Sequence, residues 1–353
     1  MTDRQADRET RRQDKSSRDG RGGKRRNGQD RRFTVILAAA CILAAVLSAV
    51  ILLWPQESVP TDSGYADDRE ESDGTVVWNG REYVYNDHLS NYLFLGVDRR
   101  EVTETQAGQT DAGQADALFL LSRDRVTGDL TLISIPRDTM TPVEVIGPDG
   151  TSLGVSEDHI SLSYGYGDGG HESCRLTREA VSALLYGLPV QGYCAVRLNA
   201  LPVLMEAVGE LNVTVPNDSL RDTELAAQEG DTVLLDQDNI ETFVRYRDID
   251  ETGSAMERLE RQQAFLAAWY DAFREKAAAD AGSITDLYGA LEPYLTTNMD
   301  SGEFADIMED AAGTQIDTWT VPGENVEGDY YDEYHVDDSA LYEKVLETFY
   351  ISE

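Results

Sequence analysis

The longest apolar pattern in the chain is an uncharged run near its N-terminus. Residues 33–54 form 22 consecutive positions without a charged side chain. At about 1.5 Å per residue, a helix of this length reaches about 33 Å, enough to cross a hydrocarbon core of about 30 Å. A cleaved signal peptide has a shorter apolar core, of about 7–15 residues. The pattern therefore predicts one transmembrane helix over 33–54.

Beyond this run, shorter apolar segments separated by turn residues alternate between the periods of strands and helices. Strands are predicted at 92–97, 117–122, 130–135, 192–198 and 211–215, and helices at 176–186, 202–208 and 340–350. A further helix should begin within 295–304, with Asp300 or Ser301 as its N-cap. The polar turn between the second and third strands predicts a hairpin. This alternation favours a layered α/β fold, in which helices flank a mixed β-sheet.

Charge and composition divide the chain into four parts. Residues 1–32 carry 12 Lys and Arg against 6 Asp and Glu, so the positive-inside rule keeps this tail in the cytoplasm. Residues 55–80 are rich in Asp, Glu, Ser, Gly and Pro, which predicts a flexible linker. Residues 81–353 should form one extracytoplasmic domain, because no low-complexity run divides them. The sequence thus predicts a single-pass cell-membrane protein.

The predicted outer part is strongly acidic, which restricts its partners. Of the 30 basic and 66 acidic residues of the chain, 18 and 60 lie beyond residue 32, a net charge of −42. Such a surface repels polyanions and attracts divalent cations. Nucleic acid is therefore a poor partner, and a transcriptional regulator acting through the basic tail is disfavoured. A phosphate-bearing substrate needs a local basic cluster.

The cysteines and histidines suggest little chemistry. Cys41 lies in the predicted membrane helix. The helix expected between Cys174 and Cys194 should hold these residues too far apart for a disulfide, which needs Cα atoms within about 7 Å. We therefore expect buried free thiols. The four histidines lack the spacing of a zinc site.

Two aspartates flank the first pair of predicted strands. Asp98 follows the first strand in the segment LGVDRR, and Asp116 precedes the second in QADALFL. If these strands are antiparallel neighbours, both carboxylates lie at one edge of the sheet. Mg²⁺ is bound through one or two carboxylates, with water and substrate phosphates completing its shell. The structural alternative is that each Asp caps a turn.

A basic cluster stands out from the acidic background within residues 243–265. If FVRYR is a strand, Arg245 and Arg247 point to the same face. On the following helix, Arg258, Arg261 and Gln262 are spaced by three and four residues and share a face. Arginine forks bind phosphate oxygens bidentately, and helix N-termini attract anions, so this set suits a pyrophosphate group. Surface ion pairs with neighbouring acidic residues are the alternative.

Arg137 adds a candidate in the segment SIPRDT, directly after the third predicted strand. Pro136 ends that strand, which places Arg137 in a loop at a strand end, where binding residues concentrate. With the carboxylates and the other arginines, it makes a set suited to phosphoryl transfer, a reaction that depends mainly on charge neutralisation. The chain has neither a GxxxxGK phosphate loop nor a nucleophile-elbow serine.

These segments resemble the LytR-CpsA-Psr family of bacterial cell-envelope proteins. LGVDRR, SIPRDT, FVRYR and the RLERQQ helix occur in the family's order, and the family core spans about residues 91–275. The resemblance implies a phosphotransferase that attaches a glycopolymer from a polyprenyl-pyrophosphate carrier to peptidoglycan through a phosphodiester bond. It also implies a Gram-positive cell envelope and a membrane anchor beside the lipid substrate.

The resemblance further implies roles for particular residues. Asp98 and Asp116 resemble the family's Mg²⁺ carboxylates, with Mn²⁺ as a possible replacement ion. The residues that resemble its pyrophosphate-binding catalytic shell are Arg137, Arg245, Arg247, Arg258 and Gln262. Arg100 and Arg261 are additional candidates for contacts with the substrate phosphates. Apolar residues between sheet and helices are expected to enclose the polyprenyl tail.

Two departures from the family pattern leave the proton acceptor open. His159, Ile160 and Ser161 stand where the family commonly has Lys-Ile-Asn, and Ala255 stands where it often has an aspartate. The proton of the incoming hydroxyl could instead pass to a metal-bound water or to one of three other aspartates. These aspartates are Asp138, Asp248 and Asp250.

Two other activities are compatible with the same site. A hydrolase of the pyrophosphate would replace the sugar hydroxyl by water and release free phosphoglycan. A non-catalytic envelope module would bind the lipid-linked glycan without transferring it, and would tolerate loss of both Asp98 and Asp116.

Overall fold

The computed structural model describes residues 75–100, 105–109, 112–280, 282–328 and 331–352. All of them lie in one compact unit, Glu70–Glu353. The predicted cytoplasmic tail, membrane helix and most of the predicted linker fall outside the described residues. Within the described ranges, no helix combines the length and the hydropathy that crossing a bilayer requires.

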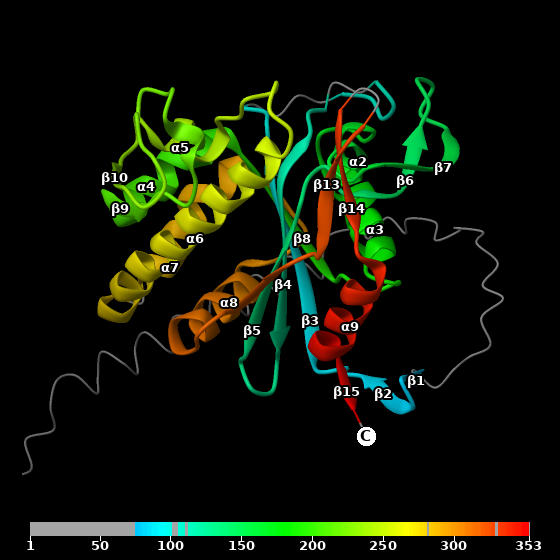
Figure 1. Cartoon of the computed structure of the whole chain (residues 1–353). Helices are drawn as coiled ribbons and strands as arrows, with labels where there is room; N and C mark the ends of the chain where they lie inside the picture. Colours follow the sequence, from blue (N-terminus) through cyan, green and yellow to red (C-terminus); the bar gives the residue numbers. More distant parts are fainter. Residues whose placement is uncertain (1–74, 101–104, 110–111, 281, 329–330, 353) are drawn as a thin grey trace, which may run out of the picture. The chain divides into compact units, whose positions relative to one another are not determined.

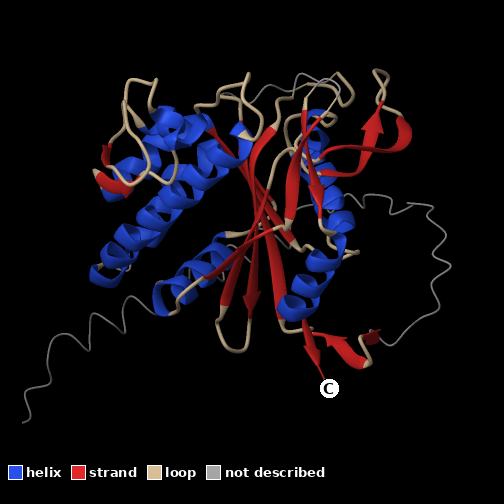
Figure 2. Ribbon diagram, viewed as in Figure 1, coloured by secondary structure: helices blue, strands red, loops and turns tan. Residues whose placement is uncertain are grey.

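A six-stranded mixed sheet forms the centre of this unit (Figures 1 and 2). Its strands run in the order β11 (Leu295–Thr297), β8 (Gly192–Arg197), β3 (Leu89–Val97), β4 (Ala115–Asp124), β5 (Leu130–Ile135) and β12 (Asp317–Thr320). The β3–β4 and β4–β5 pairs are antiparallel, whereas β3–β8 and β5–β12 are parallel. The layered mixed sheet and the β4–β5 hairpin predicted from the sequence are confirmed.

Helices cover both faces of this sheet (Figure 1). On one face, Leu93 and Leu95 of β3 are buried in the same cluster as residues of α3 (His171–Leu184) and α9 (Asp338–Phe349). On the other face, Tyr92 of β3 joins a cluster with residues of α8 (Ser301–Gly313) and α6 (Ser254–Ala279). Tyr92 lies on the face opposite to Leu93 and Leu95 because successive residues of a strand point to opposite faces.

The remaining elements extend this core. A separate hydrophobic cluster joins α6 to α4 (Leu201–Val208), β9 (Leu211–Thr214), β10 (Thr232–Leu235) and α5 (Ile240–Arg245). Two further helices are α2 (Leu162–Gly165) and α7 (Gly282–Leu291). Two hairpins pair β6 (Met140–Ile146) with β7 (Ser152–His159), and β13 (Gly323–Glu327) with β14 (Asp332–Val336). A small sheet contains β1 (Thr75–Trp78), β2 (Arg81–Tyr85) and β15 (Tyr350–Ser352). Strand β1 begins inside the range predicted as linker.

Helix ends follow local capping chemistry. Helix α8 begins after Asp300, whose carboxylate accepts hydrogen bonds from the backbone N–H groups of Gly302 and Glu303. The Glu303 carboxylate accepts from the Asp300 backbone N–H, which completes a capping box. Of the two predicted candidates, Asp300 is therefore the N-cap of α8. Helix α3 begins at His171, five residues earlier than the apolar pattern indicates.

The segment FVRYR is not a strand, which corrects the prediction from its sequence. Helix α5 runs through Arg245, and Tyr246 leaves it with extended backbone angles. The buried side chains Ile240, Phe243 and Val244 have helical spacing of three and four residues. The helix follows a turn in which Asp236 and Asn239 exchange side-chain to backbone hydrogen bonds. Arg245 and Arg247 therefore do not share a strand face.

Cys174 lies on α3 and Cys194 on β8, and both are buried free thiols. This agrees with the expectation of buried free thiols. Burial raises the pKa of the Cys194 thiol to about 12, so it is protonated at neutral pH.

Candidate functional site

Asp98, Asp116 and Arg137 lie at the ends of three central strands, on the same side of the sheet. We call this line of strand ends the sheet edge. Val97, the last residue of β3, pairs with Ala115 at the start of β4. Leu118 of β4 pairs with Ile135, the last residue of β5. Asp98 and Arg137 follow their strands by one and two residues. The prediction that Asp98 and Asp116 lie at the same edge of the sheet agrees with this strand pairing.

Asp116 is held between two arginines from distant segments. Its Oδ1 pairs with Nη1 of Arg137, and its Oδ2 lies 3.3 Å from Nη1 of Arg258 on the first turns of α6. The Arg258 side chain is only 6% exposed. Burial, which disfavours its charge, lowers the pKa of Arg258 despite the neighbouring Asp116. The tertiary fold thus places β4, the loop after β5 and α6 around one carboxylate.

Asp138 links Arg137 to a third arginine. Its Oδ1 lies 3.0 Å from Nε of Arg137, and its Oδ2 lies 3.9 Å from Nη1 of Arg247. The closer contact is an ion pair that is not aligned as a hydrogen bond, because Nε of Arg137 has no hydrogen-bond partner within the described part of the chain. Oδ2 of Asp138 likewise accepts no hydrogen bond from the described residues. We call Arg137, Arg247, Arg258, Asp116 and Asp138 the arginine cluster.

The arginine cluster has surplus positive charge and unused donors. It contains three guanidinium groups and two carboxylates, and every side chain in it is at least four-fifths buried. Nε of Arg258 also lacks a hydrogen-bond partner among the described residues. Buried polar groups are normally hydrogen-bonded, and guanidinium forks match the oxygens of phosphate. The cluster is therefore suited to receive an anion with several oxygens.

Arg245 and Arg100 lie outside the arginine cluster and share one carboxylate. Glu241 pairs with Nη1 of Arg245 at 2.7 Å and with Nη2 of Arg100 at 2.6 Å. The hydrogen bonds from these two arginines lower the pKa of Glu241, although burial opposes the shift. Both guanidinium groups are more than a third exposed. They form a neighbouring patch that the structure does not bring into contact with Asp116.

Arg261 and Gln262 are directed toward the backbone of α5. Nε of Arg261 donates to the carbonyl of Phe243 at 2.8 Å, and its two Nη groups donate to Ser219 and to the carbonyl of Tyr246. Gln262 donates to the carbonyl of Val244 at 3.1 Å. Burial lowers the pKa of Arg261 to about 10. These contacts hold the chain that leads from α5 to Arg247.

Two contacts of Arg137 were not anticipated from the sequence. Its Nη2 donates to Oε1 of Gln114 and lies 3.2 Å from Oγ of Ser161. The backbone N–H of Gln114 also donates to Oδ1 of Asp98 at 2.8 Å. Ser161 thus occupies part of the site where the family pattern commonly has a residue of another type. Gln114 carries no sequence signal beyond its place two residues before Asp116.

The two sheet-edge carboxylates are compatible with Mg²⁺. The described residues contain no group of three or more His, Cys, Asp or Glu side chains arranged to hold a metal ion. Mg²⁺ does not require such a group, because it commonly binds one or two carboxylates and keeps waters or phosphate oxygens as its other ligands. Asp98 and Asp116 provide hard oxygen donors at one edge, so their chemistry fits this ion.

Comparisons with known proteins agree with the fold and indicate the family. A "polyisoprenyl-teichoic acid–peptidoglycan teichoic acid transferase TagU" from Oceanobacillus iheyensis is 24% identical over 85% of this chain and 88% of its own length. The protein of the same name from Bacillus subtilis is 26% identical over 70% and 73%. The crystal structure of B. subtilis TagV has 22% identity and a TM-score of 0.56 over 74% of this chain and 96% of its own. The sequence model of the LytR_cpsA_psr family matches residues 56–348, and the chain belongs to this family.

Proposed function

We propose that this protein is a membrane-anchored phosphotransferase that transfers a glycopolymer from a polyprenyl-pyrophosphate carrier to peptidoglycan. The observation that carries the proposal is the arginine cluster, a buried group with excess positive charge inside an otherwise acidic chain. Family membership and the names of the curated relatives support the same reaction class. The relatives named for teichoic acid suggest an anionic glycopolymer.

In this proposal the three arginines exchange their carboxylate partners for pyrophosphate oxygens. Arg137 and Arg258 release Asp116, and Arg247 moves from its 3.9 Å contact with Asp138 to the substrate. Arginine forks then neutralise the charge that spreads over the phosphate oxygens during transfer. A Mg²⁺ ion held by Asp98 and Asp116, or Mn²⁺ in its place, would supply additional charge neutralisation at these oxygens.

The transfer exchanges one phosphorus–oxygen bond for another. The acceptor hydroxyl oxygen bonds to the phosphorus next to the glycan, and the bond from that phosphorus to the bridging oxygen breaks. Polyprenyl phosphate leaves with the electron pair, and the hydroxyl proton passes to a base. Asp138 is the best placed of the three candidate aspartates, because it contacts Arg137 and is 6% exposed, whereas Asp248 and Asp250 are exposed loop residues.

The apolar face of the sheet below α6 and α8 is the proposed path of the polyprenyl tail. Phe94, Leu132, Val196 and Tyr270 are only partly buried there, although they pack against a buried cluster. The opposite face of the same strands has fully buried residues such as Leu93 and Leu118. Partly covered apolar side chains leave area for a lipid chain to bury. The predicted membrane helix over 33–54 would keep the enzyme beside this lipid.

A transfer assay with the full-length protein in detergent tests the proposal. The donor is a labelled polyprenyl-pyrophosphate glycan and the acceptor is a peptidoglycan oligomer, with and without Mg²⁺. We expect label on the acceptor that depends on the metal and that falls by about 10²–10³-fold in Arg247→Ala, the range for removing one donor to a charged transition state. Arg274→Ala, an exposed arginine on α6, is the matched control.

The same assay separates the proposal from its two alternatives. Release of free phosphoglycan with an unlabelled acceptor would identify a hydrolase. Tight donor binding without any turnover, unchanged by Asp98→Ala with Asp116→Ala, would identify a binding module. Either result would contradict the proposed transfer.

A further inference from the structure

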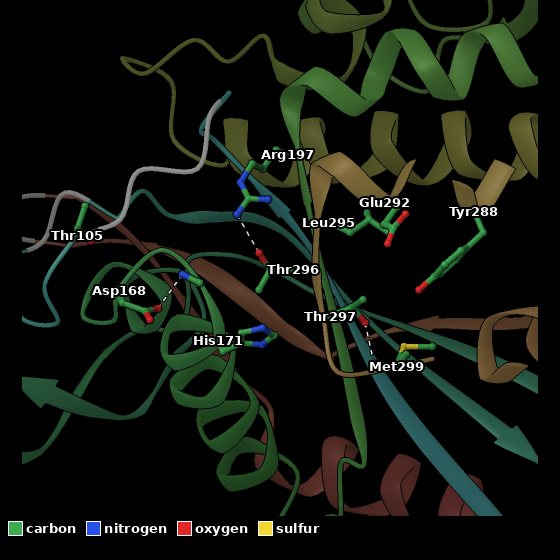
Figure 3. A pocket seen from close by; sticks show the side chains of 11 residues that line it. Thr105, Asp168, His171, Arg197, Tyr288, Glu292, Leu295, Thr296, Thr297 and Met299 are labelled. Atoms are coloured by element: carbon green, nitrogen blue, oxygen red, sulfur yellow. Dashed lines mark hydrogen bonds between the residues drawn. The ribbon is translucent and has the colours of Figure 1, made fainter. Parts of the chain in front are cut away.

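A pocket of about 740 Å³ lies beside the edge strand β11 (Figure 3). Its lining comes from the start of α3, the end of β8, β11 itself and the end of α7. Arg137, Arg247 and Arg258 are not among its lining residues. Figure 3 shows Arg197 between a wall formed by Asp168 and His171 and a wall formed by Tyr288 and Glu292. We call this the Arg197 pocket.

Arg197 is a buried cation that forms no direct ion pair within the described part of the chain. It is 5% exposed, and its Nη2 donates to Oγ1 of Thr296 at 2.8 Å. Its Nη1 is buried and has no hydrogen-bond partner, and no carboxylate within the described ranges pairs with it. A buried charge without a partner is costly, so such groups are normally paired or bind a ligand. Arg197 therefore keeps one unpartnered donor, although Asp168 and Glu292 also line the pocket.

The pocket lies at the same end of the sheet as the proposed reaction site. Arg197 is the last residue of β8 and pairs in register with Val97, which directly precedes Asp98. The backbone N–H of Leu198 donates to the carbonyl of Arg99 at 3.1 Å, which fixes the ends of β8 and β3 together. A ligand bound at Arg197 would thus lie one strand away from Asp98.

The other lining groups define the kind of ligand. Glu292 and Oδ2 of Asp168 offer carboxylate acceptors, whereas Oδ1 of Asp168 already accepts from the backbone N–H groups of Gly170 and Ser173. Tyr288 and Leu295 offer aromatic and apolar area. The two carboxylates would repel a polyanion, whereas they can accept hydrogen bonds from hydroxyl groups. One anionic group at Arg197, several hydroxyls and a ring that packs on Tyr288 describe an acidic sugar.

We propose that the Arg197 pocket is a subsite for a saccharide unit that carries a single anionic group, either a carboxylate or a phosphate. Its place beside Asp98 makes it a subsite for glycan next to the reacting pyrophosphate. That role rests on the proposed function, but binding of the acidic sugar does not depend on it.

Histidine resonances provide local reporters for the test. The chain has four histidines. His171 lines the pocket, with Nδ1 2.8 Å from the Tyr193 hydroxyl. His159 lies two residues from Ser161, which contacts Arg137 in the arginine cluster. In full-length protein with labelled histidine rings in detergent micelles, each resonance can be assigned by a His→Gln variant and followed during a titration.

The probes are glucuronate, glucose 6-phosphate and the neutral control glucose. We expect both acidic sugars to shift the His171 resonance saturably, and the tighter of the two identifies the preferred anionic group. Arg197→Gln should weaken this binding at least about tenfold, as expected for loss of a charge-assisted bond. Arg258→Gln and the surface control Arg274→Gln should leave the His171 response unchanged.

Several results would overturn the subsite. These are equal binding of glucose and glucuronate, no response at His171, or a response confined to His159 that Arg258→Gln abolishes. If Arg197→Gln binds acidic sugars normally while transfer still proceeds, the subsite is wrong and the proposed function stands. If transfer fails in the wild type while the His171 response is present, the subsite stands and the proposed function is wrong.

The melting temperature of Arg197→Gln tests whether Arg197 has a purely structural role. Removing a buried unpaired charge should leave the melting temperature of Arg197→Gln equal to or above that of the wild type in the absence of sugar. A decrease of more than about 5 °C, a size typical of losing a buried contact, would show that the arginine holds the fold instead.

Discussion

At the scale of single residues, two arginines three positions apart on α6 have opposite surroundings. Arg258 faces the sheet edge, where its contacts with Asp116 are long, at 3.3 to 3.5 Å, and its Nε is unpartnered within the described chain. Arg261 is fully buried and directs its donors to two backbone carbonyls and a serine. Burial lowers the pKa of both groups, yet only Arg258 keeps donors available for a substrate.

Arg258→Gln should therefore affect chemistry more than folding. We expect the rate of glycan transfer to fall by about 10²–10³-fold, because one donor to the phosphate oxygens is lost. The melting temperature should change little, since Asp116 keeps its contact with Arg137. Initial rates and a thermal melt of the same preparation check both statements, and a variant with normal transfer would contradict the assigned role.

Arg261→Gln should give the opposite result. The shorter side chain leaves the carbonyls of Phe243 and Tyr246 without their donors, which we expect to cost about 2–4 kcal/mol of unfolding free energy. Denaturant unfolding measures this loss. Because Arg261 fixes the segment that carries Arg247, any loss of transfer should recover at lower temperature, where the native state is populated. Full stability in this variant would refute the structural role.

At the scale of secondary structure, local signals predict the elements unequally. The β5 boundaries and the β4–β5 hairpin follow from apolar runs around one polar turn. For FVRYR, the aromatic and β-branched residues favoured a strand. The helix forms instead because Ile240, upstream of that segment, completes a buried helical stripe with Phe243 and Val244. Strand β12 was not predicted, because its parallel partner β5 lies far away in the sequence.

The capping box of α8 gives a prediction at this scale. Asp300→Ala removes the acceptor for two backbone N–H groups and should cost about 1 kcal/mol, or about 2–4 °C in melting temperature for a domain of this size. Asp300→Asn keeps a side-chain acceptor and should restore most of the loss. Thermal melts of both variants check this. Equal stability of Asp300→Ala and wild type would show that the cap contributes nothing.

At the scale of the whole molecule, the sequence predicted the components of the site better than their contacts. Asp98 and Asp116 were predicted at one sheet edge and Arg137 in a loop at a strand end, and the structure agrees because strand order and strand ends determine these positions. The pairing of Arg258 with Asp116 spans 142 residues, and no local pattern encodes it. The same holds for Asp138 between Arg137 and Arg247, and for the Gln114 contact.

The overall charge explains why the arginine cluster is a strong indication of function. The whole chain has a formal net charge of −36, so a buried group with three cations and two anions is out of keeping with its surroundings. Surface ion pairs would account for Arg100 and Arg245, which share Glu241, but not for this cluster. The cluster and the predicted lipid-side anchor together favour an anionic lipid-linked substrate.

The most direct test is the chemical identity of the product formed by the full-length protein from a polyprenyl-pyrophosphate glycan and a peptidoglycan oligomer. Mass spectrometry and phosphorus NMR of the acceptor should find the glycan attached through one phosphorus in a phosphodiester, with an equal amount of polyprenyl monophosphate released. An unmodified acceptor accompanied by free glycan phosphate would contradict the account, because water and not the peptidoglycan hydroxyl would then be the nucleophile.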